Sequence, residues 1–418
     1  MRVLTATLCY PAPDAPEEGV FVQRRLAALA CRYPIDVRVV APRLRCPLLR
    51  PRRPEGASAG PLPAWYPAMT SVPLVGRLTD GLAFARCLWR AVRAAGDWTP
   101  DLLDAHFEYP DGVGAWLAGR RLRIPVVVTV RGKIEALSRR TVRRLQIRAM
   151  LRGVDAVIAV SRSLARRVHA VAGSDVDVQV IPNGVDTAVF APSDRAAARA
   201  ALGWSESARY LLAVGHLQRV KGFDRAAAAL PAVRAMMGDV RLVLVGSTRG
   251  EPAFKRRLKR QMASCGGPPA VSFAGPVPAE RLRLMYAAAD VLVCPSRSEG
   301  WCNAVAEALA CGTPVVATPV GGNPEQIDDP ALGILSDGQA PEALAAAMVE
   351  ALRRSWDRGA IAARGGLRDW GRVADEVYGV FRRVLADRGI RRRATIPCAG
   401  SGAAGRARAG VTGMEAGA

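Results

Sequence analysis

Two carboxylates stand eight positions apart in the stretch SRSEGWCNAVAEALACG, residues 296–312. Glu299 follows an apolar run typical of a strand, and Glu307 lies in a helical pattern that begins after Gly300. Were that helix extended back, the two carboxylates would share one side, about 12 Å apart along the axis. Carboxylates accept hydrogen bonds from hydroxyl groups, and the amides of a helix N-terminus attract anions. The spacing predicts a site for an elongated ligand with hydroxyls at both ends and phosphates between; the alternative is that the acids serve only the helix macrodipole.

Short apolar runs alternate with helical patterns along most of the chain. Strand-like runs occur at 3–9, 36–42, 101–106, 124–130, 155–161 and 177–183, and again at 210–215, 240–246, 270–275, 290–296 and 314–318. Buried strands that alternate with helices form parallel sheets with crossover helices. The sequence therefore predicts an α/β protein with two doubly wound, Rossmann-like domains.

The alternation restarts near the middle of the chain, and this sets the expected domain limits. We expect a first Rossmann-like domain at 1–190, a second at 191–369, a closing helix at 370–388 and a disordered tail at 389–418. The tail is rich in Gly, Ala and Arg and has no hydrophobic period. Two such domains facing each other place ligands at the carboxyl ends of their strands, in the cleft between them.

Composition narrows the class of protein. The net charge of +22 favours anionic partners such as phosphate-rich substrates, nucleic acid or an anionic membrane leaflet. Nine scattered cysteines and three distant histidines give no support for a metal site or a disulfide framework. No apolar run is long enough to span a membrane, and the apolar stretch at the N-terminus is too short for a signal peptide. We therefore expect a cytoplasmic protein.

Five motifs in register carry a resemblance to a known family. They are EGVFVQRRLAAL after the first strand, VIPNGVDTAVFAP at the domain junction, AVGHLQRVKGFD and FAGPVPAERL in the second half, and SEGWCNAVAEALACGTPVVATPVGGNPE around the two glutamates. With these motifs the chain resembles the retaining glycosyltransferases of family 4 over about residues 1–388. The resemblance implies the GT-B fold: an acceptor-side first domain faces a nucleotide-sugar-binding second domain across a cleft, and the final helix crosses back to the first domain.

The resemblance implies a role for each motif residue. Glu299 would contact hydroxyls of the donor sugar, and Glu307 would hold the ribose of the nucleotide. Lys221, one of only four lysines, would bind the donor diphosphate and follow the charge that develops on the leaving group. The backbone at Gly19 would approach the phosphates closely. Further donor contacts are implied where the helix starts, at Gly300, Trp301 and Asn303.

The sequence departs from the family pattern at two positions. His216 stands where an arginine commonly contacts the diphosphate, and Arg219, three residues on, is a candidate replacement. Arg131 stands where many members have a histidine that lines the sugar pocket. Because an arginine cannot act as a general base, we expect Arg131 to act through its charge or by binding the acceptor.

The loop DAHFEYPDG supplies further candidates. His106 ends a strand of the first domain, so we expect it to face the cleft and to position the acceptor or the donor. Glu108 and Asp111 share the loop, and either could help an acceptor hydroxyl; the sequence does not choose between them. The catalytic candidates are therefore Glu299, Lys221, Arg131 and His106.

The resemblance implies no cofactor and no metal ion, because Lys221, arginines and a helix N-terminus replace the cation that other transferases hold with Asp-x-Asp. One such string occurs, DVD at 175–177, but it precedes a strand instead of following one. The family retains anomeric configuration, and the sequence has no evident carboxylate pair like that of a glycosidase. The resemblance implies same-face attack, with the leaving phosphate taking the acceptor's proton.

Two arginine-rich segments lie in the first domain. Residues 136–152 hold six arginines and no acid, and residues 43–54 hold five arginines. At helical spacing, 136–152 would align Arg140, Arg144, Arg148 and Arg152 beside an apolar stripe. Such a face suits docking onto an anionic leaflet that carries a lipid-linked acceptor. The alternative is a solvated helix face.

The sequence thus predicts a retaining glycosyltransferase that moves a sugar from a nucleotide sugar to a glycan or lipid-linked saccharide in bacterial envelope or exopolysaccharide synthesis. Its expected partners are these substrates and an anionic membrane surface, bound peripherally on the inner face of the plasma membrane, and not nucleic acid. The alternatives are a nucleotide-sugar epimerase on the same fold and a non-catalytic protein that binds polyanions or membrane. The epimerase would need a full set of acid and base residues, which the motifs do not supply. Nucleic-acid binding would need aromatic residues among the basic ones.

Overall fold

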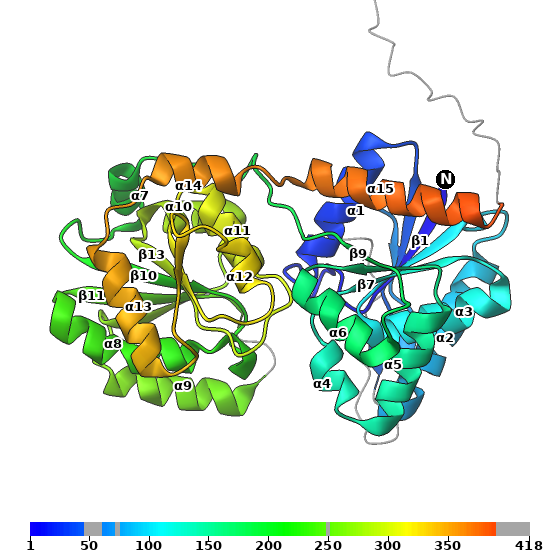
Figure 1. Cartoon of the computed structure of the whole chain (residues 1–418), viewed down its shortest axis with the longest axis horizontal. Helices are drawn as coiled ribbons and strands as arrows, with labels where there is room; N and C mark the ends of the chain where they lie inside the picture. The colour runs from blue at the N-terminus through cyan, green and yellow to red at the C-terminus, as the bar shows by residue number, and fades with distance from the viewer. Residues whose placement is uncertain (46–60, 72–75, 248–250, 390–418) are drawn as a thin grey trace, which may run out of the picture.

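Two parallel sheets, one in each half of the chain, organise the protein (Figure 1). The computed structural model describes residues 1–45, 61–71, 76–247 and 251–389. The predicted disordered tail, apart from Gly389, and most of the basic segment 43–54 lie outside the described residues.

The first sheet has seven parallel strands in the order β4-β2-β1-β6-β7-β8-β9, and a separate pair joins β3 to β5. Their bounds are β1 Arg2–Ala6, β2 Asp36–Val40, β3 Arg43–Arg45, β4 Ala64–Trp65, β5 Ala68–Thr70, β6 Leu102–His106, β7 Val126–Val130, β8 Ala156–Ala159 and β9 Val178–Val180. Strands β6, β7 and β8 are buried along their whole length, which explains why the sequence shows them as unbroken apolar runs.

The second sheet has six parallel strands in the order β12-β11-β10-β13-β14-β15. Their bounds are β10 Arg209–Val214, β11 Val240–Val245, β12 Val271–Gly275, β13 Val291–Cys294, β14 Val315–Ala317 and β15 Gly333–Leu335. The strand order reverses between β10 and β13, as it does between β1 and β6 in the first sheet. In doubly wound sheets such switch points open a crevice at the carboxyl ends of the strands.

Helices cover both sheets. In the first half they are α1 Val20–Arg32, α2 Gly76–Ala94, the π-type turn η1 Glu108–Gly112, α3 Val113–Leu122, α4 Ile134–Ser138, α5 Thr141–Gly153 and α6 Arg162–Ala172. In the second half they are α7 Arg195–Leu202, the 3-10 turn η2 Arg219–Lys221, α8 Phe223–Met237, α9 Pro252–Ser264, α10 Ala279–Ala288, α11 Asn303–Ala310, α12 Asn323–Gln326, α13 Pro341–Arg353, α14 Arg358–Gly365 and α15 Trp370–Asp387.

Helix α15 returns to the first domain and packs along α1 (Figure 1). Tyr33 and Tyr378 stack with ring centroids 3.8 Å apart, and Arg32 donates two hydrogen bonds to Asp375, at 2.7 and 3.0 Å. The apolar side of α15 joins the core formed by α1 and the first sheet. The predicted fold, two doubly wound domains with a final helix that crosses back, is confirmed.

The basic segment 136–152 is not one helix, contrary to the prediction. Helix α4 ends at Ser138 and α5 begins at Thr141, with an extended backbone at Arg140. The break lets Ile134 on α4 and Ile147 on α5 both enter the core of the first domain. Arg140 therefore precedes α5 instead of continuing its arginine stripe.

The chain crosses between the domains twice, and the two crossings lie side by side. Val185 pairs with Asp369 in an isolated parallel bridge, and the Val185 amide donates to Arg368 O at 2.9 Å. The Arg368 guanidinium donates back to Pro182 O through two nitrogens, at 3.1 and 3.0 Å. The paired crossings fix where the two domains join.

Direct contacts also join the domains away from the crossings. The backbones of Gly132 and Gly300 pass so closely that a Cβ added to Gly132 would lie 3.0 Å from the Gly300 Cα. Glu325 of the second domain accepts the amides of Arg162 and Ser163 at 2.8 Å each, at the N-terminus of α6 in the first domain. A carboxylate at a helix N-terminus is favoured by the unpaired amides and by the helix dipole.

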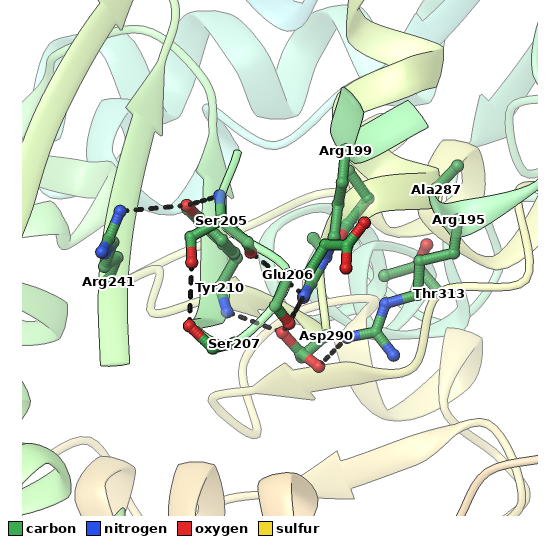
Figure 2. Close-up of polar contacts among 12 residues, drawn as sticks. Arg195, Arg199, Ser205, Glu206, Ser207, Tyr210, Arg241, Ala287, Asp290 and Thr313 are labelled. Carbon is green, nitrogen blue, oxygen red and sulfur yellow. Dashed lines mark hydrogen bonds and ion pairs between the residues drawn. The ribbon is translucent and has the colours of Figure 1, made fainter. Parts of the chain in front are cut away.

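Asp290 ties together the edge of the second sheet that lies opposite the strands' carboxyl ends (Figure 2). Its carboxylate accepts the Tyr210 amide at 2.6 Å and the Arg199 guanidinium at 2.8 Å, and it also pairs with Arg195. Arg199 further donates to Ala288 O at 3.1 Å, which anchors α7 to the end of α10. We interpret this cluster as structural, because its charged groups pair with one another and with backbone groups.

Replacing Asp290 with asparagine should destabilise the second domain by about 3 kcal/mol, because Arg195 and Arg199 lose the counter-charge of a mostly buried carboxylate. Urea unfolding measures the change. The matched control is Asp328→Asn, since Asp328 pairs with Arg364 at 3.0 Å with about half of each side chain exposed. The control should cost less than about 1 kcal/mol. Equal losses in the two variants would contradict a structural role for the Asp290 cluster.

Candidate active site

Lys221 and Glu299 meet at the switch point of the second sheet. Lys221 ends η2, which follows β10, and Glu299 lies in the loop after β13. Lys221 Nζ donates to Glu299 Oε2 at 2.7 Å, and Ser296 Oγ donates to the same oxygen at 3.1 Å. The structure thus brings two of the predicted residues together where open α/β sheets bind ligands.

The ion pair keeps Lys221 charged. Burial is the largest single influence and lowers the pKa of Lys221, but the charge and hydrogen bond of Glu299, together with nearby groups, raise that pKa above its ordinary value. Only 24% of the Lys221 side chain and 11% of the Glu299 side chain are exposed. Within the described residues, Oε1 of Glu299 has no hydrogen-bond partner, so it is available to a ligand hydroxyl.

Two loops are joined to hold this pair. Gly222 adopts a left-handed φ of 70°, and a Cβ there would overlap the carbonyl oxygen of Pro295. The Arg297 amide donates to Val220 O at 2.7 Å, and its guanidinium donates to both carboxylate oxygens of Asp224, at 2.8 and 2.7 Å. The loop after β10 and the loop after β13 are therefore joined by backbone and side-chain hydrogen bonds.

Glu307 lies on α11 and faces the first domain. Tyr286 OH donates to its Oε2 at 3.0 Å, and Arg24 Nη1 on α1 lies 3.7 Å from its Oε1. Burial raises the pKa of Glu307 to about 7, and the charge of Arg24 opposes that rise. At neutral pH the carboxyl group is therefore close to its midpoint and gains from any ligand that stabilises the ionised form.

The start of α11 lies against the first domain. Helix α11 begins at Asn303, so Glu299 lies on a loop and the helix does not extend back to it. Asn303 Oδ1 accepts from Asn183 Nδ2 at 2.9 Å. The Trp301 side chain packs on the apolar core of the first domain, and Gly300 approaches the backbone of Arg131. These predicted donor-binding residues thus lie at the contact between the domains.

His216 lies near the segment before Gly19 across the same junction, since Glu17 and Glu18 act electrostatically on it. Gly19 precedes α1 with φ 69°, and a Cβ there would overlap the Cys9 carbonyl oxygen, so only glycine fits. His216 follows β10; burial and then the charge of Lys221 lower its pKa, while Glu17 of the first domain opposes this. Its ring is therefore neutral at neutral pH. The Arg219 side chain is exposed, and its carbonyl accepts from Arg297 at 2.6 Å.

His106 does not face the cleft, contrary to the prediction. Its side chain is fully buried, and both ring nitrogens have protein partners: Nδ1 accepts from Arg131 Nε at 3.0 Å, and Nε2 donates to Asp104 Oδ2 at 3.1 Å. Strand β6 is central in its sheet, so the residue at its end is covered by its neighbours. His106 is therefore linked to the domain junction only through Arg131, a residue that is 9% exposed.

Glu108 and Asp111 are also buried inside the first domain. Asp111 Oδ2 accepts the Leu8 amide at 2.8 Å, and burial raises the pKa of Asp111 to about 7. Glu108 Oε1 accepts the Arg131 amide at 3.3 Å, and burial raises the pKa of Glu108. Both carboxyl groups brace the loops that surround Arg131.

Known proteins match both halves of the chain. Residues 22–189 match the family described as Glycosyltransferase Family 4, and residues 194–365 match Glycosyl transferases group 1. The D-inositol 3-phosphate glycosyltransferase of Acidothermus cellulolyticus is 33% identical over 328 residues, which cover 73% of this chain and 72% of the relative. The protein of the same name from Mycobacterium bovis is 32% identical over 332 residues, covering 74% and 67%. The chain belongs to glycosyltransferase family 4.

Solved structures agree with this fold. Sucrose-phosphate synthase from Thermosynechococcus elongatus has a TM-score of 0.72 at 24% identity, and covers 92% of this chain and 99% of its own. HepE of Anabaena in complex with UDP has a TM-score of 0.70 at 20% identity, covering 92% and 100%. These structures show the fold alone. Membership of family 4 makes the protein a glycosyltransferase and favours this activity over the epimerase and the non-catalytic binding protein.

One group of metal-ligand side chains occurs in the described part of this glycosyltransferase. The ligand atoms of Cys294, Glu299 and Cys302 lie within 4.8 Å of one another. However, Glu299 is already paired with Lys221, and the hydrogen bond with Cys294 and burial raise the pKa of Cys302 well above its usual value. The DVD string is elsewhere: Asp175 pairs with Arg152 at 3.0 Å on the surface. The absence of a metal cofactor stays a prediction.

The sequence interpretation of this family 4 protein missed several residues of the site. They are Arg24, Asn183, Asp224, Tyr286, Ser296 and Arg297. Arg24 and Asn183 lie inside the motifs EGVFVQRRLAAL and VIPNGVDTAVFAP, so the signal was present but unassigned. Tyr286 has no such signal, because it reaches Glu307 from the preceding helix only through the tertiary fold.

Glu307 should make the second domain less stable as pH rises from about 4.5 to 7. The folded protein holds the proton of Glu307 more tightly than the unfolded chain, whose carboxyl titrates near 4.5, so ionisation costs folded stability until pH passes about 7. Relative to Glu307→Gln, the free energy of unfolding of the wild type should fall by on the order of 3 kcal/mol over this pH range. Urea unfolding at pH 5 and pH 8 checks this. The control Glu350→Gln, at an exposed position of α13, should show the same pH dependence of the free energy of unfolding as the wild type. If Glu307→Gln also showed the wild-type pH dependence, Glu307 would not be its source.

Proposed function

We propose that this glycosyltransferase moves a sugar from a nucleotide sugar, with retention, to a glycan or lipid-linked saccharide in bacterial envelope or exopolysaccharide synthesis. The observation that carries the proposal is the ion pair between Lys221 and Glu299 at the switch point, with Glu307 on the helix that follows. A cation paired with one carboxylate, with a second carboxylate on the helix that follows, matches a diphosphate flanked by two sugars. HepE of Anabaena forms complexes with UDP and with UDP-glucose, which supports a nucleotide sugar as donor.

In the proposed reaction, the bond between the sugar's anomeric carbon and the donor phosphate breaks as the acceptor oxygen attacks from the same face. The leaving phosphate oxygen takes the acceptor's proton. Lys221 stabilises the negative charge that grows on the diphosphate, and it needs no reorganisation because Glu299 already holds it. The free oxygen of Glu299 accepts hydrogen bonds from hydroxyl groups of the sugar, and Glu307 accepts hydrogen bonds from hydroxyl groups of the ribose.

We propose that no metal ion takes part. The diphosphate would be held by Lys221, by the first-turn amides of α11 and by the backbone next to Gly19. His216 stands where family members commonly have an arginine that contacts the diphosphate. Its neutral ring can donate one hydrogen bond, so it could make one such contact.

The relatives favour a second acceptor, an inositol phosphate. Both relatives described above carry the name D-inositol 3-phosphate glycosyltransferase. Arg131 gives this alternative physical support, because its guanidinium bonds Asn183, which in turn contacts Asn303 of the second domain. A guanidinium donates charge-assisted hydrogen bonds to phosphate oxygens, and Arg131 has one amino group free to do so. An acceptor assay with inositol phosphate and with lipid-linked saccharides separates the two.

A nucleotide sugar should raise the unfolding temperature of the wild-type protein. At 100 times its dissociation constant a ligand stabilises the folded state by about 2.7 kcal/mol. In a thermal-shift screen of UDP, GDP and ADP sugars, Lys221→Ala and Glu307→Ala should each abolish the shift that the wild type shows.

Two exposed residues supply matched controls for that screen. Lys259→Ala on α9 and Glu350→Ala on α13 should keep the full donor-induced shift. A full shift in both Lys221→Ala and Glu307→Ala would refute the site. No shift of the wild type with any nucleotide sugar would refute the donor class.

We further propose that helices α2 and α5 form a basic apolar face that docks on an anionic membrane. Leu78 and Leu82 on α2 are 43% and 60% exposed, and Val142 and Leu145 on α5 are 48% and 59% exposed. The two helices are adjacent, because Gln146 Nε2 donates to Leu78 O at 2.9 Å. The exposed arginines at this face include Arg139, Arg140, Arg144 and Arg148. No helix of the described residues is long and apolar enough to cross a membrane.

Binding to anionic vesicles should depend on the arginines of this face. Arg144→Glu with Arg148→Glu should weaken co-sedimentation with phosphatidylglycerol vesicles at least tenfold, since each basic residue contributes about 1 kcal/mol near the surface. The control pair Arg256→Glu and Arg260→Glu, exposed on α9 of the second domain, should bind as the wild type does. An equal loss of vesicle binding in both pairs would indicate non-specific electrostatic attraction and would contradict the proposal that α2 and α5 form the docking face.

A further inference from the structure

A chain of buried side chains runs from the core of the first domain toward the cleft. Arg25 on α1 donates to Asp104 Oδ1 at 3.0 Å and to Thr129 Oγ1 at 2.7 Å. His106 donates to the other Asp104 oxygen at 3.1 Å. Arg25 is 2% exposed and the other three are fully buried. The carboxylate of Asp104 is thus held from both sides and cannot reorient without leaving buried charges unpaired.

The direction of the hydrogen bonds is fixed at His106. Arg131 Nε donates to His106 Nδ1 at 3.0 Å, and a guanidinium has no acceptor. Therefore Nδ1 carries no proton, and Nε2 carries the proton that bonds Asp104. Burial, with the charges of Arg131 and Arg25, lowers the pKa of His106 to about 3 against the opposing effect of Asp104. The ring stays neutral and keeps this tautomer throughout the neutral range.

Arg131 continues the chain across the domain junction. Its Nη1 donates to Asn183 Oδ1 at 2.8 Å, and Asn183 Nδ2 donates to Asn303 Oδ1 at 2.9 Å. Asn183 lies in a crossing segment between the domains, and Asn303 is the first residue of α11. Asn183 therefore contacts both Arg131 and the helix that carries Glu307.

The guanidinium of Arg131 has one amino group to spare. Nε and Nη1 are used, whereas Nη2 is buried and has no hydrogen-bond partner among the described residues. The Arg131 Cζ lies 4.8 Å from the ring centroid of Phe21, in the first turn of α1 next to Gly19. A buried donor without a partner is unfavourable, so a ligand oxygen at this position would be bound favourably.

We propose that Asp104, His106 and Asn183 are positioning residues that hold Arg131 with Nη2 free to bind an oxygen of the sugar or the acceptor, and that Asn183 ties this geometry to the contact with α11. The identity of the ligand rests on the proposed function. The chain of hydrogen bonds that holds Arg131, from Asp104 and His106 on one side and from Asn183 on the other, is called the relay below and does not rest on it. The oxygen belongs to a phosphate or a hydroxyl group, both of which accept from a guanidinium. Asn183 and Asp104 touch no reacting atom and act through Arg131.

The activity test is a double-mutant cycle on kcat and KM, with the nucleotide sugar that the donor screen identifies. Arg131→Lys keeps the charge but loses the planar fork, and Asn183→Leu removes both amide hydrogen bonds. Each variant should lower kcat by tenfold or more, because small misplacement in a site has effects of up to about a hundredfold. The KM for the donor should change less than kcat in each variant, because Lys221 and Glu307, which supply the main donor contacts, are not substituted.

The combined variant decides whether Asn183 acts through Arg131. If it does, the double variant should be no slower than Arg131→Lys alone. If the reductions of kcat in the two single variants multiplied in the double variant, Asn183 would not act through Arg131. An unchanged kcat in Asn183→Leu would also overturn the relay. The control Gln179→Leu removes one side-chain hydrogen bond, to Asp177, on the edge strand β9 of the same domain and should leave kcat unchanged. Asn183→Asp keeps an acceptor for Arg131 and should recover part of the rate.

A second measurement needs no activity. The protein has three histidines, so a spectrum of protein labelled with nitrogen-15 histidine resolves His106. In the wild type, His106 should show a proton on Nε2 alone and no titration between pH 5 and 8. Arg131→Met removes the donor and the cation next to Nδ1, so His106 should titrate or populate the other tautomer.

The two measurements fail in different ways. A proton on Nδ1 in the wild type, or an unchanged spectrum in Arg131→Met, would overturn the relay even if the enzyme is active. A confirmed tautomer in a protein that turns over no nucleotide sugar would refute the proposed function and leave the relay standing. Thermal unfolding of every variant establishes that it is folded.

Discussion

A mostly buried ammonium–carboxylate pair, Lys221 with Glu299, joins the ends of two neighbouring strands in the second domain. Removing two charges from water is costly unless their geometry is fixed and their remaining bonds are made. The surrounding structure supplies both conditions. Gly222 permits the turn that aims the lysine, Ser296 shares the carboxylate oxygen, and Arg297 with Asp224 locks the two loops together. The pair is therefore ready before any ligand arrives, and this is what a transferase needs where charge develops on a leaving group.

The second constraint is the close approach of the two domains. Gly132 and Gly300 allow backbone to meet backbone, and Glu325 of one domain caps a helix of the other. The paired crossings at Val185 and Asp369 set the position from which this contact is made. Residues of both domains consequently share one site: Arg24 reaches Glu307, and Asn183 reaches Asn303. Neither domain holds all the residues of the candidate active site by itself.

Much of the fold and part of the site could be predicted from the sequence, and the reasons are local. Buried parallel strands appear as apolar runs, which predict most of the strands, including the three-residue β9 and β14, whereas β3, β4, β5 and β15 are not among the predicted runs. Lys221 and Glu299 follow strands, and residues that follow parallel strands gather at one edge of a sheet. The basic segment 136–152 was misread because the arginine spacing indicates a helix, while the need to bury Ile134 and Ile147 breaks it in two.

The sequence by itself determined the order of strands and helices, the positions of the acidic and basic residues relative to them, and the resemblance to family 4. These follow from periodicity and spacing, which depend on neighbours along the chain. Only the tertiary structure decided the state of the titratable groups: His106 is buried and neutral, and Glu307 has a pKa of about 7. It also decided that Arg131 is held by His106 and Asn183, residues 25 and 52 positions away. Burial and electrostatic interactions depend on which distant segments meet, and that is settled only when both sheets are packed and joined.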